Sequence, residues 1–167
     1  TPWVGAGDDG PITFFNKSWN TTNGVTVEGA TDKSNVRLSY SNNYQTGILP
    51  NSKMTRNNFS FNGGVALNDN LRVDASANYV KNEATGRNAT GYNGNIVSNF
   101  RQWWQTNVKL SEQKAIYDKT GLNYSWNPAS SDDPLTGIYW NNPYFERNES
   151  YTTDERDRIF GNFSVNY

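Results

Sequence analysis

Five aromatic residues between positions 82 and 153 are the main candidates for binding chemistry in this chain. They are Trp103, Trp104, Trp126, Tyr139 and Trp140. Trp and Tyr rings offer flat faces on which a sugar or a peptide can stack, and which a partner protein can also contact. The alternative is that these rings only pack their own segment together, so the sequence leaves both roles open.

The remaining polar residues predict no reaction centre. The chain has 0 His and 0 Cys, which removes the commonest general base and excludes disulfides and thiolate metal sites. Asp132 and Asp133 in "SSDDP" are adjacent and lack the spaced ligands of a calcium loop, so a solvated turn is favoured. In "DERDR", residues 154–158, charge pairing along and across strands is favoured over anion binding. We therefore predict no enzyme activity, no cofactor and no metal.

Composition indicates an ordered chain that is too polar for an ordinary packed interior. Aromatic residues make up 14% and hydrophobic residues 34%. A disordered chain would be poor in aromatic residues. The net charge is −1 and the basic residues are scattered, which argues against a nucleic-acid partner. A sheet with one apolar face and one polar, wet face fits this composition.

Alternating apolar and polar residues predict five β-strands. In the fourth, Leu71 and Val73 alternate with Arg72 and Asp74. The connections between the strands are short, longer, short and very long, in that order. The predicted strands cover about residues 21–29, 35–45, 56–67, 71–81 and 157–167, and the very long connection covers about residues 82–153.

This arrangement predicts an all-β fold: an antiparallel segment of a transmembrane β-barrel with a long, partly helical extracellular loop. Bacterial outer-membrane barrels have short turns at one end and long loops at the other, with strands of about 9–11 residues. Aromatic residues near strand ends suit the membrane interface; those of this chain are Tyr40, Phe59, Tyr79 and Tyr167. Alternation alone also fits a soluble β-sandwich, but Gly63, Ala75 and Ala77 would pack a sandwich core poorly.

The two faces of the predicted sheet then have different surroundings. The residues expected to face the lumen are Arg37, Ser39, Ser60, Asn62, Arg72, Asp74, Ser76 and Asn78. The residues expected to face lipid are Val25, Val27, Val36, Leu38, Phe59, Phe61, Val65, Leu71, Val73, Phe163 and Val165.

Two helices are predicted inside the long loop. Val97, Phe100, Trp104 and Val108 recur at helical spacing through "SNFRQWWQTNVKL". Ser111 is the predicted N-cap of a second helix, "EQKAIYDK", and Gly121 follows its end. Residues 125–145 are rich in Pro, Asn and Asp and are predicted to be irregular.

The stretches "VTVEGATDKSNVRLSYSNNYQTGILPNS" and "RNNFSFNGGVALNDNLRVDASANYV" resemble the first part of the barrel of SusC/RagA-type TonB-dependent outer-membrane transporters. "FRQWWQTNVKL" is similar to the helical insert of their long external loop, and "DERDRIFGNFSVNY" to the strand that returns from it. The usual Ser-Gly-Gly of the first turn is "EGA" here. The positions that match the family's order are Gly29, Asp32, Lys33, Ser34, Tyr40, Gly47, Ile48, Arg56 and Asn58.

The resemblance implies a barrel of about 22 strands with a plug in its lumen. It also implies uptake of glycans or peptides, driven by TonB, with a SusD-like surface lipoprotein over the outer mouth. The location would be the outer membrane of a Gram-negative bacterium, in contact with its lipid. The plug and the segment that contacts TonB are expected outside this chain. Two alternatives stay open: a secreted, soluble β-sandwich that binds carbohydrate, and a structural subunit of an outer-membrane assembly.

Overall fold

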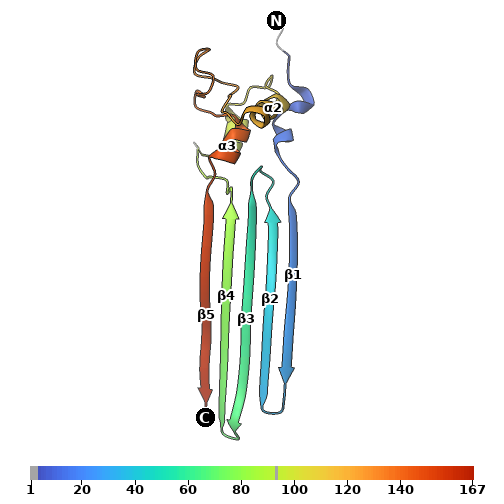
Figure 1. Ribbon diagram of the computed structural model, residues 1–167, viewed down its shortest axis with the longest axis vertical. Helices are drawn as coiled ribbons and strands as arrows, with labels where there is room; N and C mark the ends of the chain where they lie inside the picture. The colour runs from blue at the N-terminus through green and yellow to red at the C-terminus, as the bar shows by residue number, and fades with distance from the viewer. Residues whose placement is uncertain (1–3, 93) are drawn as a thin grey trace. The chain divides into compact units, whose positions relative to one another are not determined.

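The computed structural model describes residues 4–92 and 94–167, which form two compact units. The sheet unit comprises residues 19–46, 53–84 and 154–167, and the loop unit is built from the segments around them. The sheet unit is one antiparallel sheet with strand order β1-β2-β3-β4-β5 (Figure 1). Its strands are β1 (Trp19–Ala30), β2 (Ser34–Thr46), β3 (Lys53–Asn68), β4 (Leu71–Thr85) and β5 (Thr153–Asn166).

Strand pairing aligns apolar residues on one face and polar residues on the other. Tyr40 of β2 lies opposite Val25 of β1 and Phe59 of β3, and Leu38 lies opposite Phe61. The intervening Arg37 lies opposite Glu28 and Asn62. Side chains one residue apart point to opposite faces of a strand, so this register places these apolar residues on one side. Phe160 of β5 is an exception, because it follows Ile159 and points to the polar face. The predicted alternation of the two faces is confirmed.

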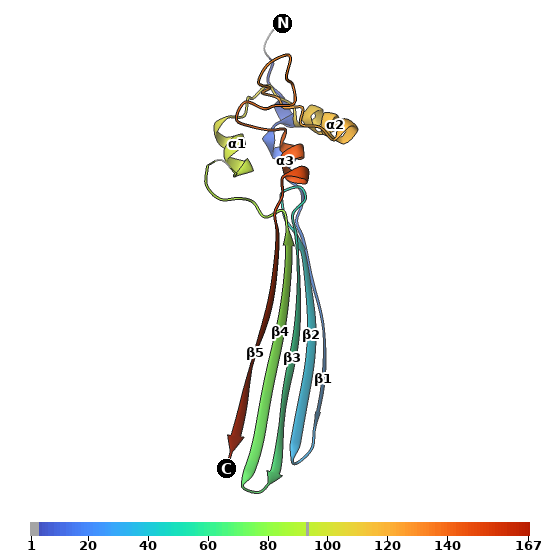
Figure 2. The ribbon, with the colours of Figure 1, turned by 60° about the vertical axis from the view of Figure 1, so that its left-hand side comes forward.

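The sheet is open, and both of its faces are largely accessible. Its strands form a single layer (Figure 2) in which β1 and β5 each have one neighbour. Among the described residues there is neither a closed barrel nor a second sheet. Leu38 is 53% exposed and Val165 is 56% exposed, so large apolar side chains of the sheet have no packing partner across their face.

The strands are longer than the alternation predicts. They contain 12, 13, 16, 15 and 14 residues in chain order. The prediction that Tyr40, Phe59 and Tyr79 lie near strand ends is therefore wrong, because each is followed or preceded by several more paired residues. The added length is rich in Asn and Thr, which alternation of apolar residues does not detect but which a neighbouring strand pairs equally well.

The loop unit holds the buried apolar cluster of the chain. Phe14, Leu49, Ile96, Leu110 and Tyr144 are its buried members, and Phe15, Phe100, Trp104 and Tyr117 pack against them. These residues come from three segments that are far apart in sequence.

No helix in the described ranges is both long and apolar enough to span a membrane.

Both predicted helices of the loop unit exist, with different ends. Helix α1 (Ile96–Gln102) ends before Trp104 and Val108, which the helical spacing had included. Its N-cap is Asn95, whose side chain accepts a hydrogen bond from Val97 N at 3.0 Å. Helix α2 (Leu110–Thr120) ends at Gly121 as predicted, in the left-handed conformation with φ 65°.

The predicted N-cap of α2 is wrong, because Ser111 lies within the helix. The carboxylate of Asp9, from the 3₁₀ helix η1 (Gly7–Asp9), instead accepts hydrogen bonds from Ser111 N at 3.0 Å and from Ser111 Oγ. These bonds hold the pKa of Asp9 below its ordinary value. A residue distant in sequence thus caps the helix, which no local pattern can indicate.

A third helix, α3 (Pro143–Glu149), was not predicted. Asn142 caps it by accepting hydrogen bonds from Tyr144 N and Phe145 N, and Pro143 occupies the first turn. This N-cap followed by Pro is a recognised start signal, which the polar composition of residues 125–145 concealed. Tyr117 of α2 donates a hydrogen bond to Glu149 of α3 at 2.8 Å. Burial of the Tyr117 side chain and, as the second cause, this hydrogen bond raise the pKa of Tyr117 to about 12.

Arg147 of α3 joins three segments of the loop unit. Its guanidinium donates to Pro50 O at 3.0 Å and to Gly86 O, while Asn51 Nδ2 donates to Arg147 O at 3.0 Å. Burial lowers the pKa of Arg147. Gly86 has φ 65°, and a Cβ there would lie 1.8 Å from the carbonyl oxygen of Asn51. These contacts require glycine at position 86.

Candidate functional site

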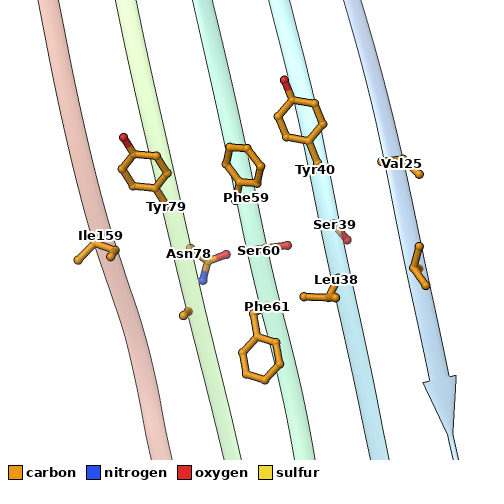
Figure 3. A pocket seen from close by; sticks show the side chains of 12 residues that line it. Val25, Leu38, Ser39, Tyr40, Phe59, Ser60, Phe61, Asn78, Tyr79 and Ile159 are labelled. Atoms are coloured by element: carbon orange, nitrogen blue, oxygen red, sulfur yellow. The ribbon is translucent and has the colours of Figure 1, made fainter.

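The apolar face of the sheet carries an uncovered band of large side chains. Phe59 is 50% exposed and Phe61 is 38% exposed. The band contains a shallow hollow of about 440 Å³, shown in Figure 3. Its apolar lining comes from all five strands and comprises Val25, Val27, Leu38, Tyr40, Phe59, Phe61, Ala77, Tyr79 and Ile159.

Three aromatic rings form a row across the upper part of this band. Tyr40 and Phe59 have ring centroids 4.6 Å apart, and Phe59 and Tyr79 have centroids 6.3 Å apart. Both tyrosine hydroxyls point the same way along the strands, away from Phe61 (Figure 3). Tyr40 donates to Asn57 Oδ1 at 2.8 Å, and Tyr79 donates to Asp157. The row therefore has an apolar side and a hydrogen-bonded side.

Polar residues replace the apolar ones immediately beyond this row. Asn42 Nδ2 donates to Asn57 Oδ1 at 2.8 Å, and Lys81 Nζ lies 2.7 Å from Glu155. Each of these side chains lies an even number of residues along its strand from a ring of the aromatic row, or from a residue bonded to such a ring. Because side chains at even spacing point to the same face of a strand, they share the face of the aromatic row. They lie toward the end of the sheet from which the long connections leave. One strand face is thus apolar over part of its length and polar over the rest.

The height of the apolar band can be estimated from β3. Phe59 and Leu67 bound it on that strand, and eight steps of about 3.4 Å give about 27 Å along the strand. At a tilt of about 40°, this corresponds to about 21 Å along the membrane normal, close to the band of about 25 Å in transmembrane barrels.

The opposite, polar face brings together the residues predicted to face a lumen. Arg72 Nη2 lies 2.8 Å from Asp74 Oδ1 and donates to Asn35 Oδ1 at 2.9 Å. The Arg72–Asp74 pair lies over Gly64, where a Cβ would meet both side chains within 2.4 Å. Register and alternation place Arg37, Ser39, Ser60, Asn62, Ser76 and Asn78 on this face as well.

The five aromatic candidates of the loop unit separate into two groups. Trp104 and Trp126 pack on each other with centroids 5.3 Å apart, and their buried Nε1 atoms have no hydrogen-bond partner. They serve the packing role that the sequence left open. Trp103, Tyr139 and Trp140 instead line a hollow of about 580 Å³. We call this the aromatic hollow.

Tyr92 completes the aromatic hollow and was missed by the sequence reasoning. Trp103 Nε1 donates to Tyr92 Oη at 2.7 Å, and the Tyr92 ring lies 6.5 Å from that of Trp140. Tyr139 is 88% exposed and has φ 70°, a left-handed conformation that is uncommon for residues other than glycine. The hollow is therefore lined by aromatic residues that are largely exposed: Tyr92 is 52% exposed and Trp103 is 51% exposed.

A smaller polar recess of about 80 Å³ adjoins the hollow, because both are lined by Tyr139 and Trp140. Its polar lining includes Asn99, Asn141 and Glu146. Asn99 is 1% exposed, and its Oδ1 atom has no hydrogen-bond partner. Glu146 Oε2 accepts from Asn141 Nδ2 at 2.7 Å. The lining of the recess thus includes the unpartnered Oδ1 atom of Asn99 and the carboxylate of Glu146.

The other charged clusters behave as local structure. Asp133 accepts from Thr136 N at 3.2 Å within a turn, and the described residues hold no group of three or more acidic or His side chains suited to a metal. In "DERDR", Arg156 Nε donates to Asp154 Oδ1 at 3.0 Å, which agrees with the predicted pairing along the strand.

Comparison with known proteins adds no relative: no family model and no curated protein sequence matches this chain.

Proposed function

We propose that this chain is a segment of a transmembrane β-barrel in the outer membrane of a Gram-negative bacterium. The observation that carries the proposal is the apolar band of the sheet, which is uncovered, bordered by the aromatic row and followed by hydrogen-bonded polar residues. Lipid-facing strands of barrels have this order, since Tyr rings favour the level of the headgroups.

The open edges of the sheet support a larger assembly. Strands β1 and β5 each have one neighbour, and unpaired backbone groups are costly in hydrocarbon. In the proposed barrel, further strands pair with both edges. The polar face, which carries Arg72 and Asp74 near the start of β4, then lines an aqueous lumen, where charged groups keep their hydration.

The function that we propose for the complete barrel is TonB-dependent import of a glycan or a peptide, in the manner of SusC/RagA-type transporters. The sequence resemblance of the strands supports this part of the proposal. In such a transporter the loop unit would be extracellular, and the partners would be a SusD-like lipoprotein and TonB. Loss of growth on a glycan or peptide in cells that lack the protein, or lack TonB, would be the expected phenotype.

The membrane placement can be tested by a cysteine scan, because the chain contains 0 Cys. Leu38→Cys places a thiol on the apolar face, and Ser39→Cys places the next thiol on the polar face. In intact outer membranes, a water-soluble maleimide should label Ser39→Cys and leave Leu38→Cys unlabelled, and a lipid-soluble maleimide should label Leu38→Cys.

Asn42→Cys is the matched control on the apolar side, since Asn42 lies beyond the aromatic row. It should react with the water-soluble reagent. Equal labelling of Leu38→Cys and Ser39→Cys by that reagent would contradict the proposal, and so would recovery of the protein in the soluble fraction.

A further inference from the structure

We propose that the aromatic hollow and the adjoining recess form one binding site for an organic ammonium ion, with the amine head in the recess and the apolar body against the rings. The proposal concerns the loop unit alone. It does not depend on whether the sheet lies in a membrane.

The first argument is the unsatisfied acceptor in the recess. Asn99 is 1% exposed, it lines the recess, and its Oδ1 atom has no hydrogen-bond partner. Buried polar atoms in folded proteins are nearly always hydrogen-bonded, so an exception needs an explanation. A ligand that brings a hydrogen-bond donor into the recess would supply the missing partner.

The second argument is the charge of the lining. Glu146 contributes a carboxylate to the recess, of which Oε2 accepts from Asn141 at 2.7 Å. An ionised carboxylate has about four acceptor positions, so one such bond leaves capacity for more. In the described part of the lining of both the hollow and the recess, there is no Lys or Arg. Arg147, whose charge interacts with Glu146, directs its guanidinium to Pro50 O and Gly86 O. A protonated amine in the recess therefore meets acceptors and negative charge.

The third argument is the aromatic surround. The faces of Trp and Tyr rings attract cations through their quadrupole, most strongly where water is partly excluded. Tyr139 and Trp140 line both cavities, so a head in the recess and a body in the hollow would contact the same two residues. Tyr139 is 88% exposed and has a left-handed backbone conformation, which is uncommon for residues other than glycine.

The sizes of the two cavities fit a ligand with a small head and a larger body. The recess, at about 80 Å³, is much smaller than the hollow, at about 580 Å³. The hollow is within the range of ligand pockets, which is roughly 300–1,000 Å³. An aminomethyl group suits the recess, whereas the ring of a neutral sugar is too large for it and would lie in the hollow. A sugar hydroxyl in the recess would bring no positive charge to Glu146.

The test compares two probes that differ only in the head group, benzylamine and benzyl alcohol, with cellobiose as a neutral saccharide. Each is titrated at pH 7 into the full-length protein in detergent, and binding is followed by ligand-observed NMR and calorimetry. We expect benzylamine to bind about tenfold or more tightly than benzyl alcohol, because a charge-assisted hydrogen bond is about twice as strong as a neutral one. We expect no saturable binding of cellobiose.

Glu146→Gln and Glu149→Gln form a matched pair, because both remove one negative charge from α3 and only Glu146 lines the recess. Glu146→Gln should lower the affinity for benzylamine about tenfold and leave that for benzyl alcohol unchanged. Glu149→Gln should change neither. Tyr139→Ala should weaken the binding of both probes. Because Tyr139 is exposed, this variant should fold even if Glu146→Gln does not.

Three results would overturn the proposal. They are equal affinities of the unmodified protein for benzylamine and benzyl alcohol, binding of cellobiose in place of the amine, and equal losses in the two glutamate variants. None of these results bears on the cysteine scan of the sheet, so the two proposals fail separately.

Discussion

A charge placed at the centre of the apolar band should destabilise the protein in lipid. Val36 lies opposite Gly63, midway between Phe59 and Leu67 on the neighbouring strand, and is 44% exposed. An Arg at the midplane of a barrel costs about 2–4 kcal/mol, and near the interfaces it costs about 0–1 kcal/mol. We therefore expect Val36→Arg to lower the free energy of unfolding from lipid vesicles by about 2–4 kcal/mol.

Two further variants separate depth from general damage. Asn42→Arg lies on the same face as Val36 but six residues along β2, or about 20 Å along the strand, and should cost about 0–1 kcal/mol. Ser76→Arg lies on the polar face and should change the stability by less than about 0.5 kcal/mol.

The assay is urea unfolding of the full-length protein from phospholipid vesicles, followed by Trp fluorescence. The reasoning is refuted if Val36→Arg loses no more stability than Ser76→Arg, because the apolar face would then not contact hydrocarbon. Equal losses of stability for Val36→Arg and Asn42→Arg would refute the prediction that Val36 lies deeper in the membrane than Asn42.

Three further predictions concern the loop unit, and each is checked by thermal or chemical unfolding. Gly86→Ala should lower the stability of the protein by more than about 1 kcal/mol, because a Cβ would clash there. Gly121 has the same φ of 65° but open space for a Cβ, so Gly121→Ala should lower the stability by only about 1 kcal/mol. Equal losses in the two variants would contradict the clash at position 86. Because the pKa of Asp9 is lower in the folded state, its ionised carboxylate stabilises the fold. This stabilisation is fully present above the unfolded-state pKa of about 3.9 and is lost as the pH falls through the folded-state pKa. Asp9→Asn should remove that part of the acid dependence, and an unchanged acid profile would show that the cap contributes nothing. Trp104→Ala should cost about 1–3 kcal/mol as a partly buried ring packed against the apolar cluster, and Tyr139→Ala less than about 0.5 kcal/mol as an exposed one. The reverse order would contradict the assignment of the two rings.

The five strands and their faces could be predicted because alternation is a local property of the backbone. Every second residue of an extended strand points to the same side, so Leu71 and Val73 separate from Arg72 and Asp74 without knowledge of any neighbour. The strand ends could not be predicted in this way. Residues such as Thr46 and Lys53 continue the ladder because the adjacent strand offers hydrogen-bond partners.

The candidate site illustrates the opposite case. Trp103 and Trp104 are adjacent and chemically identical, and both backbone N–H groups donate to Asn99 O at 3.0 Å. One ring nevertheless lines the aromatic hollow and the other packs against Trp126. No local sequence pattern indicates that Tyr92, Asn99 and Glu146 lie near these rings.

The sequence by itself determined the two-faced strands, the order of short and long connections, and the set of aromatic residues from which a site is made. Only the tertiary structure decided which rings are exposed, that Asp9 caps a helix about a hundred residues away in the chain, and that Asn99 and Glu146 share a recess. The physical reason is range: alternation depends on the geometry of successive peptide units, whereas burial depends on segments that meet only after the chain has folded.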